Sequence, residues 1–228
     1  MSTYSSVCEV YSRRIGNEVG WLSNVVNSGT DKINISSTPL GKLFLGALNN
    51  QAKFASCKMQ IVYLVDLFDA FMQDYIEARD NVEMVAINRP NFFRDHLKSL
   101  DTAWSTFCSQ NHPLNQSKSF MNITYSLFVI ENKYGIKYPS YLSPLVLELG
   151  SMRNCLVHYD GELSHNDKGG DPFRKTLNRT LKYINFSGDK INDININNYI
   201  NKVIFDLQTF VDLCGGKIDR PGEQANET

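Results

Sequence analysis

Long apolar runs are missing from this sequence. No segment reaches the roughly 18 uninterrupted apolar residues that a membrane-spanning helix requires. The first residues, MSTYSSVCEVYSRRIG, contain no apolar stretch as long as that of a secretory signal peptide. We therefore expect a cytoplasmic protein that has no membrane partner.

The chain also lacks an excess of charge of either sign. Its 23 Lys and Arg residues are balanced by 24 Asp and Glu residues, which gives a net charge of −1. No overall field attracts nucleic acid to such a chain. Any binding of RNA must come from a local patch or from dimerisation.

Recognisable sets of metal ligands and cofactor loops are absent as well. Cys108 and His112 stand four residues apart, but no further ligands complete a structural zinc site. The stretch 41–46 contains two glycines but lacks the Lys-Ser/Thr ending of a nucleotide-binding loop. We expect neither a metal nor a cofactor. Five scattered cysteines indicate reduced thiols in a cytoplasm: Cys8, Cys57, Cys108, Cys155 and Cys214.

The sequence does contain many hydrophobic residues that repeat at the spacing of an α-helix. Hydrophobic residues make up 42% of the 228 residues, including 13 Phe and 11 Tyr. The patterns predict an all-α, up-and-down helical bundle, with a weak alternation compatible with a short β-hairpin over 180–186 and 190–196. We assign an N-terminal helical extension to 1–50, a helical domain to 51–214 and a disordered tail to 215–228. Helices are predicted over 6–26, 39–48, 51–83, 91–107, 117–133, 143–158 and 197–214.

The stretch from Ser143 to Leu163 carries the clearest functional pattern. Ser143 suits the helix N-cap, Pro144 suits the first helical position, and Gly161 suits the exit. Four apolar residues recur at helical spacing and predict one buried stripe: Leu145, Leu149, Met152 and Leu156.

The opposite face of that helix is unusual. At about 100° per residue it carries Gly150, Ser151, Asn154 and His158, with Arg153 between the two faces. An ordinary solvated face would carry mainly Lys and Glu. This face is suited to contact a ligand or another protein.

The order Arg153-Asn154-Cys155-Leu156-Val157-His158, close to the end of a late helix, resembles the HEPN domain. The resemblance implies an all-helical bundle that dimerises through the motif helices. In active members it implies a metal-independent endoribonuclease, often a toxin or an antiphage-defence effector with an antitoxin or regulator. In one toxin subfamily a Tyr follows the His after one intervening residue. Here Tyr159 comes one place earlier, so modification by a nucleotidyltransferase is not carried over.

The residue types suit cleavage of RNA without a metal. His158 can exchange a proton near neutral pH, and the fork of Arg153 can hold phosphate oxygens. Asn154 can orient the phosphate. On an ideal helix, however, positions five apart point about 140° away from each other. Either the helix loosens before His158, or Arg153 reaches round, and a two-fold dimer would bring two copies of the face together.

Other interpretations stay open. Arg153 and His158 could simply be favourable cations at a helix C-terminus. A non-catalytic module could use the same face to hold a partner protein or a nucleotide. Cys155 and His158 could form a nucleophilic pair, although no third residue is recognisable.

The segment after the motif is the predicted RNA contact, although a plain solvated surface explains it equally well. Between His165 and Lys190 it contains six cations and three anions, and the rings of Phe173 and Tyr183 are available to stack on bases. The main predicted RNA-binding residues are Arg174, Lys175, Arg179 and Lys182.

Overall fold

The computed structural model describes residues 4–30, 39–80, 95–110, 118, 122–139, 142–166, 170–184, 186–191 and 196–216. This part of the chain is all-α, as predicted. It forms seven α-helices and two 3₁₀ helices: α1 (Tyr4–Thr30), α2 (Pro39–Asp80), η1 (Lys98–Leu100), α4 (Asp101–Gln110), α5 (Ile123–Tyr134), α6 (Pro144–His158), α7 (Phe173–Thr176), η2 (Thr180–Tyr183) and α8 (Ile196–Cys214).

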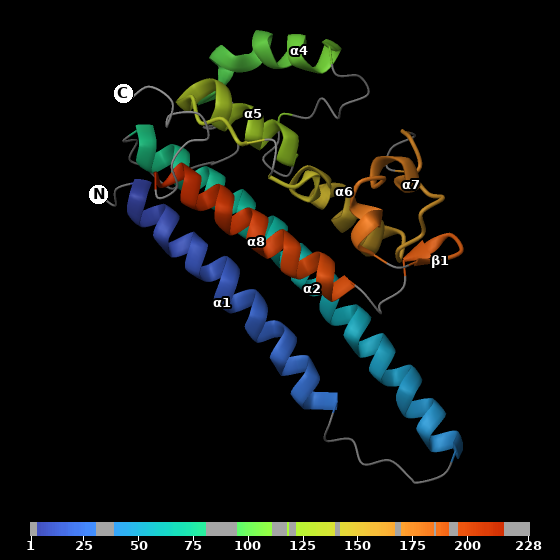
Figure 1. The fold of residues 1–228 in the computed structure, drawn as a ribbon. Helices are drawn as coiled ribbons and strands as arrows, with labels where there is room; N and C mark the ends of the chain where they lie inside the picture. The colour runs from blue at the N-terminus through green and yellow to red at the C-terminus, as the bar shows by residue number, and fades with distance from the viewer. Residues whose placement is uncertain are drawn as a thin grey trace, which may run out of the picture.

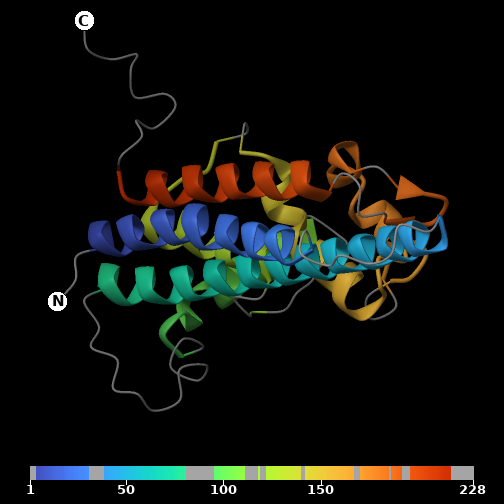
Figure 2. The same cartoon turned by 90° about the horizontal axis from the view of Figure 1, so that it is seen from below.

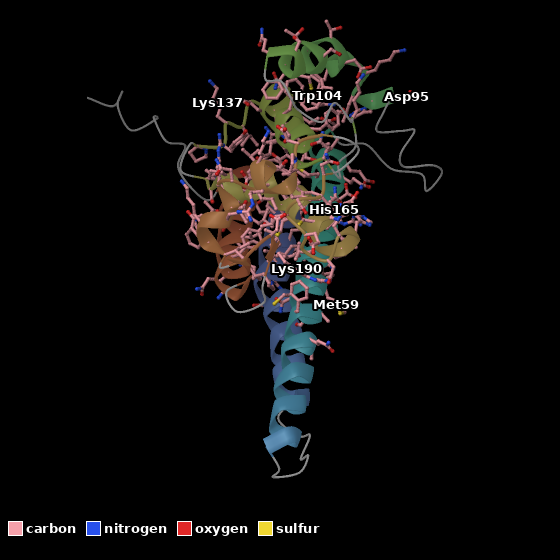
Figure 3. The ribbon with its side chains drawn as sticks, turned by 90° about the vertical axis from the view of Figure 1, so that its right-hand side faces the viewer. Met59, Asp95, Trp104, Lys137, His165 and Lys190 are labelled. Carbon is pink, nitrogen blue, oxygen red and sulfur yellow. The ribbon has the colours of Figure 1, made fainter. Side chains whose placement is uncertain are left out.

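Three long helices pack against one another. Helices α1, α2 and α8 lie side by side, and α6 packs against both α2 and α8 (Figures 1 and 2). Helix α5 packs against α6, and α4 contacts α5 through Trp104, whose ring lies edge-on to Tyr125 and Phe128. The last part of α1 and the first part of α2 project together beyond the other helices (Figure 3).

Helix α2 is longer than the sequence pattern suggests. It runs over 42 residues without interruption across Asn49 and Asn50, where we expected a bend or an end. Asparagine lowers helix propensity only slightly, so an apolar pattern on both sides can carry the helix through it. The suggested boundary at residue 50 lies inside this helix, and Cys8, Tyr11 and Ile15 of α1 belong to the same core as α2.

Helices α2 and α8 pack through buried aromatic side chains. Phe68 of α2 packs on Phe71 and on Phe210 of α8, with ring centroids 6.3 and 5.6 Å apart. An acidic residue of α2 is also partly covered by α1. Asp74 accepts a hydrogen bond of 2.6 Å from the Tyr11 hydroxyl, which ties α1 to α2.

The β-hairpin is present but shorter than predicted. Strands β1 (Phe186–Ser187) and β2 (Lys190–Ile191) pair antiparallel. The prediction of a strand from residue 180 is wrong, because η2 occupies 180–183 and the hydrogen bonds between its backbone groups are local. Residues 192–195 and most of the expected tail lie outside the described residues. Among the described helices, none is long and apolar enough to span a membrane.

Candidate functional site

Helix α6 begins and ends as its sequence predicts. The Leu145 amide donates a hydrogen bond of 3.2 Å to Ser143 Oγ, and Pro144 is the first helical residue. At the other end, Gly161 adopts a φ of +82° and its amide donates to the Cys155 carbonyl at 3.0 Å. The predicted apolar stripe is fully buried, since none of its side chains has measurable exposure: Leu145, Leu149, Met152 and Leu156.

The three predicted catalytic side chains meet within one chain. Arg153 Nη1 lies 3.1 Å from His158 Nε2 and donates to Asn154 Oδ1 at 3.0 Å. Helix α6 remains regular up to His158, so it is the long stem of Arg153 that bridges the angular gap. Because a guanidinium can only donate, the contact requires a His158 Nε2 that carries no proton.

The accessibility of these groups differs. His158 is exposed, while Arg153 and Asn154 are half-buried. The Nε of Arg153 is buried and has no hydrogen-bond partner within the described part of the chain. An unpaired buried N–H costs about 1–3 kcal/mol, a cost that calls for an explanation in a folded protein. A ligand can therefore reach His158 from solvent.

The turn after His158 is held by Lys58 and Lys190, a role that the sequence analysis did not predict for either lysine. Asp160 adopts a φ of +50° and forms ion pairs with Lys58 of α2 and, at 2.6 Å, with Lys190 of β2. Hydrogen bonds from Lys190 and Lys58 lower the pKa of the Asp160 carboxyl. Lys58 is 102 residues away in the chain, so no local pattern could have indicated this contact.

The two aromatic residues named as possible stacking partners for bases differ in their exposure to solvent. Phe173 is only 2% exposed, so its assignment as a base-stacking residue is wrong. Its ring packs beneath Tyr159, with centroids 5.5 Å apart. Tyr183 is 40% exposed and stays a stacking candidate.

The predicted RNA-binding cations do not form one free patch. Arg174 donates to Asp189 Oδ1 at 2.9 Å and to the Gly188 carbonyl at 2.7 Å, so it anchors the hairpin. Lys175 pairs with Asp171 at 3.2 Å. Two of the predicted cations are exposed and form no ion pair within the described ranges: Arg179 and Lys182.

The structure disfavours a nucleophilic cysteine in the motif. Cys155 is fully buried, and its Sγ donates to the Glu162 carbonyl at 3.7 Å. Burial, and then the charge of Glu162, raises the pKa of the Cys155 thiol to about 12. A thiolate is therefore scarce at neutral pH. Across the residues that are described, no three His, Cys, Asp or Glu side chains gather as metal ligands.

Comparisons of the chain with protein-family models, with curated proteins and with solved structures found no match.

Proposed function

We propose that this protein is a metal-independent endoribonuclease of the HEPN type. The observation that carries the proposal is the 3.1 Å contact between Arg153 Nη1 and His158 Nε2, with Asn154 bound to the same nitrogen. The contact places a fixed positive charge beside an exposed imidazole at the surface. A role as a toxin or antiphage-defence effector, with an antitoxin or regulator, is part of this proposal.

The chemistry follows from these groups. An RNA phosphate would take over the hydrogen bond that Arg153 now donates, which frees His158 Nε2 to accept the proton of the ribose 2′-hydroxyl. The O2′–P bond forms as the P–O5′ bond breaks, and the guanidinium stabilises the added charge on phosphorus. An imidazolium then returns a proton to the departing 5′-oxygen.

A homodimer through α6 would supply the second imidazole. Beside His158, the accessible face of α6 carries half-buried Gly150 and Ser151, which allow close approach, and Val157, an apolar side chain that is 42% exposed. A two-fold axis through this face would place two copies of the Arg153–His158 pair near each other. Gel filtration with light scattering tests the dimer directly.

The proposal is tested by incubating the purified protein with labelled RNA in excess EDTA. We expect cleavage with 2′,3′-cyclic phosphate ends, lowered by about 10²- to 10⁴-fold in His158→Ala and in Arg153→Ala. Lys137→Ala removes an exposed cation that lies outside both the motif and the predicted RNA-contact segment, and it serves as the matched control. Intact RNA with the wild-type protein, or cleavage unchanged in His158→Ala, would contradict the proposal.

The exposed Val157 on the same face also supports a second candidate, a non-catalytic module that holds a partner protein or a nucleotide. Such a module would leave RNA intact and would retain a partner stably on the α6 face. Toxicity separates the two candidates, because only the nuclease should become easier to express when His158 is replaced by Ala.

A further inference from the structure

Aromatic rings continue outward from the candidate catalytic histidine. The ring of Tyr159 lies edge-on to His158, with centroids 6.4 Å apart and planes at 74°. The imidazole of His165 stacks on the Tyr159 ring, with centroids 5.3 Å apart and an angle of 16° between the ring planes. The buried Phe173 supports Tyr159 from a tilted position. The rings therefore form a continuous row that begins at His158 and ends at an exposed histidine.

The backbone on either side of His165 is held in place. The Phe173 amide donates to the His165 carbonyl at 2.9 Å, and the Arg174 amide donates to the Leu163 carbonyl at 3.0 Å. The Leu163 amide in turn donates to the Asp189 carbonyl at 2.8 Å. These bonds join the segment to both α7 and the hairpin. His165 is nevertheless exposed (labelled in Figure 3). Tyr159 covers one face of its ring, and a ligand can approach from outside.

The charges around this row favour an uncharged ring over a phosphate. Asp189, which is close enough to interact electrostatically with His165, is paired with Arg174. Asp160 is paired with Lys58 and Lys190, and Glu162 provides a second negative charge that interacts electrostatically with Lys190. Fixed charges of both signs are thus largely offset here, in contrast to the guanidinium beside His158.

We propose that His165 is the platform on which the nucleobase next to the scissile phosphate stacks, so that it selects single-stranded RNA over duplex. This inference rests on the proposed function, because it places the phosphate at Arg153 and His158. A base stacked on His165 would extend the row by one ring. Since every base has an aromatic face, the platform binds without strict sequence preference.

The test combines protein and substrate changes. We would measure the Kd of a short single-stranded RNA by fluorescence anisotropy on the inactive His158→Ala background, and the KM of cleavage with His158 intact. His165→Ala should raise both on the order of ten-fold, while His165→Phe should restore them. An RNA with an abasic nucleotide at the flanking position should bind the His165→Ala protein and its parent equally well.

The outcomes separate this inference from the proposed function. Cleavage by the wild-type protein with Kd and KM unchanged in His165→Ala would overturn the platform and leave the nuclease standing. Phe205→Ala, which removes a 63% exposed aromatic ring from α8, is the matched control, and an equal loss in that variant would also overturn the assignment. Failure of the wild-type protein to bind or cleave RNA would overturn both proposals.

Discussion

Glu148 of α6 accepts a hydrogen bond of 2.8 Å from the backbone amide of Thr180, and the Thr180 hydroxyl donates to the same carboxylate oxygen. Thr180 is fully buried, so both of its donors depend on this partner. The pair joins the motif helix to the start of η2, and through it to the segment that leads into the hairpin.

Replacing Glu148 with Ala should therefore destabilise the fold. The change leaves two buried donors of Thr180 unpaired, at a cost of about 2 kcal/mol or more in the free energy of unfolding. Glu148→Gln keeps an acceptor and should lose less. Urea unfolding followed by circular dichroism measures both variants, and an Ala variant as stable as the wild type would contradict the assignment.

Asp80 should make the stability of the protein dependent on acid pH. Partial burial by itself would raise the pKa of this carboxyl, but hydrogen bonds from Lys133 and His96 outweigh it, and the pKa is lowered. A lowered pKa in the folded state stabilises the fold above the unfolded value of 3.8 and loses that contribution as the pH falls through the folded value. The stability difference between wild type and Asp80→Asn should be largest at neutral pH and shrink in acid. Unfolding in urea at pH 7 and pH 3 tests this, with Asp66→Asn as an exposed control on the same helix.

Cys155 should be inert in the folded protein. With its pKa raised to about 12, about one thiol in ten thousand is ionised at pH 8, and the side chain is buried. All five cysteines are free and buried, so a thiol reagent such as DTNB should label them only after unfolding. Cys155→Ala should keep RNA cleavage within about two-fold of wild type, because the thiol takes no part in the proposed chemistry. Rapid native labelling, or loss of cleavage in a folded Cys155→Ala protein, would count against this.

Adding a side chain at Gly161 should lower the stability of the fold more than adding one at Gly135. Its φ is +82°, and a Cβ added there would lie 3.3 Å from the Ile191 Cβ and 3.4 Å from the Ile191 carbonyl oxygen. Gly135 has a similar φ of +68° but open space around it, so Gly135→Ala measures the conformational strain alone. We expect about 1–2 kcal/mol for that strain and a larger loss in Gly161→Ala. Thermal melts of the two variants give the comparison, and equal losses would show that the contact with Ile191 is unimportant.

Helix α6 illustrates how far the sequence could predict this fold. Its N-cap at Ser143, its exit at Gly161 and its buried stripe follow from interactions within a few residues of one another, which local spacing records. The hairpin was predicted less well. Alternation of apolar and polar residues indicates extended chain, but the Thr180 amide donates to Glu148, a residue 32 positions earlier.

The candidate site shows the same division. The grouping of Arg153, Asn154 and His158 was predicted from residue types, whereas the route by which Arg153 reaches His158 depends on side-chain torsions that no spacing specifies. His165 escaped prediction because its stacking on Tyr159, six residues earlier, depends on how the chain folds after the end of α6. Phe173 was misassigned for the related reason that burial is decided by what packs over a residue.

By itself, the sequence determined that this chain folds into helices, which faces of those helices are buried, and that a guanidinium, an amide and an imidazole share one helix. These properties arise from periodicity and from capping, and both act over a few residues. The tertiary structure alone decided that Lys58 forms an ion pair with Asp160, that Arg174 donates hydrogen bonds to the hairpin, and that His165 stacks on Tyr159. Such contacts join residues that only the packing of α2, α6 and the hairpin brings together, so their geometry exists only in the folded chain.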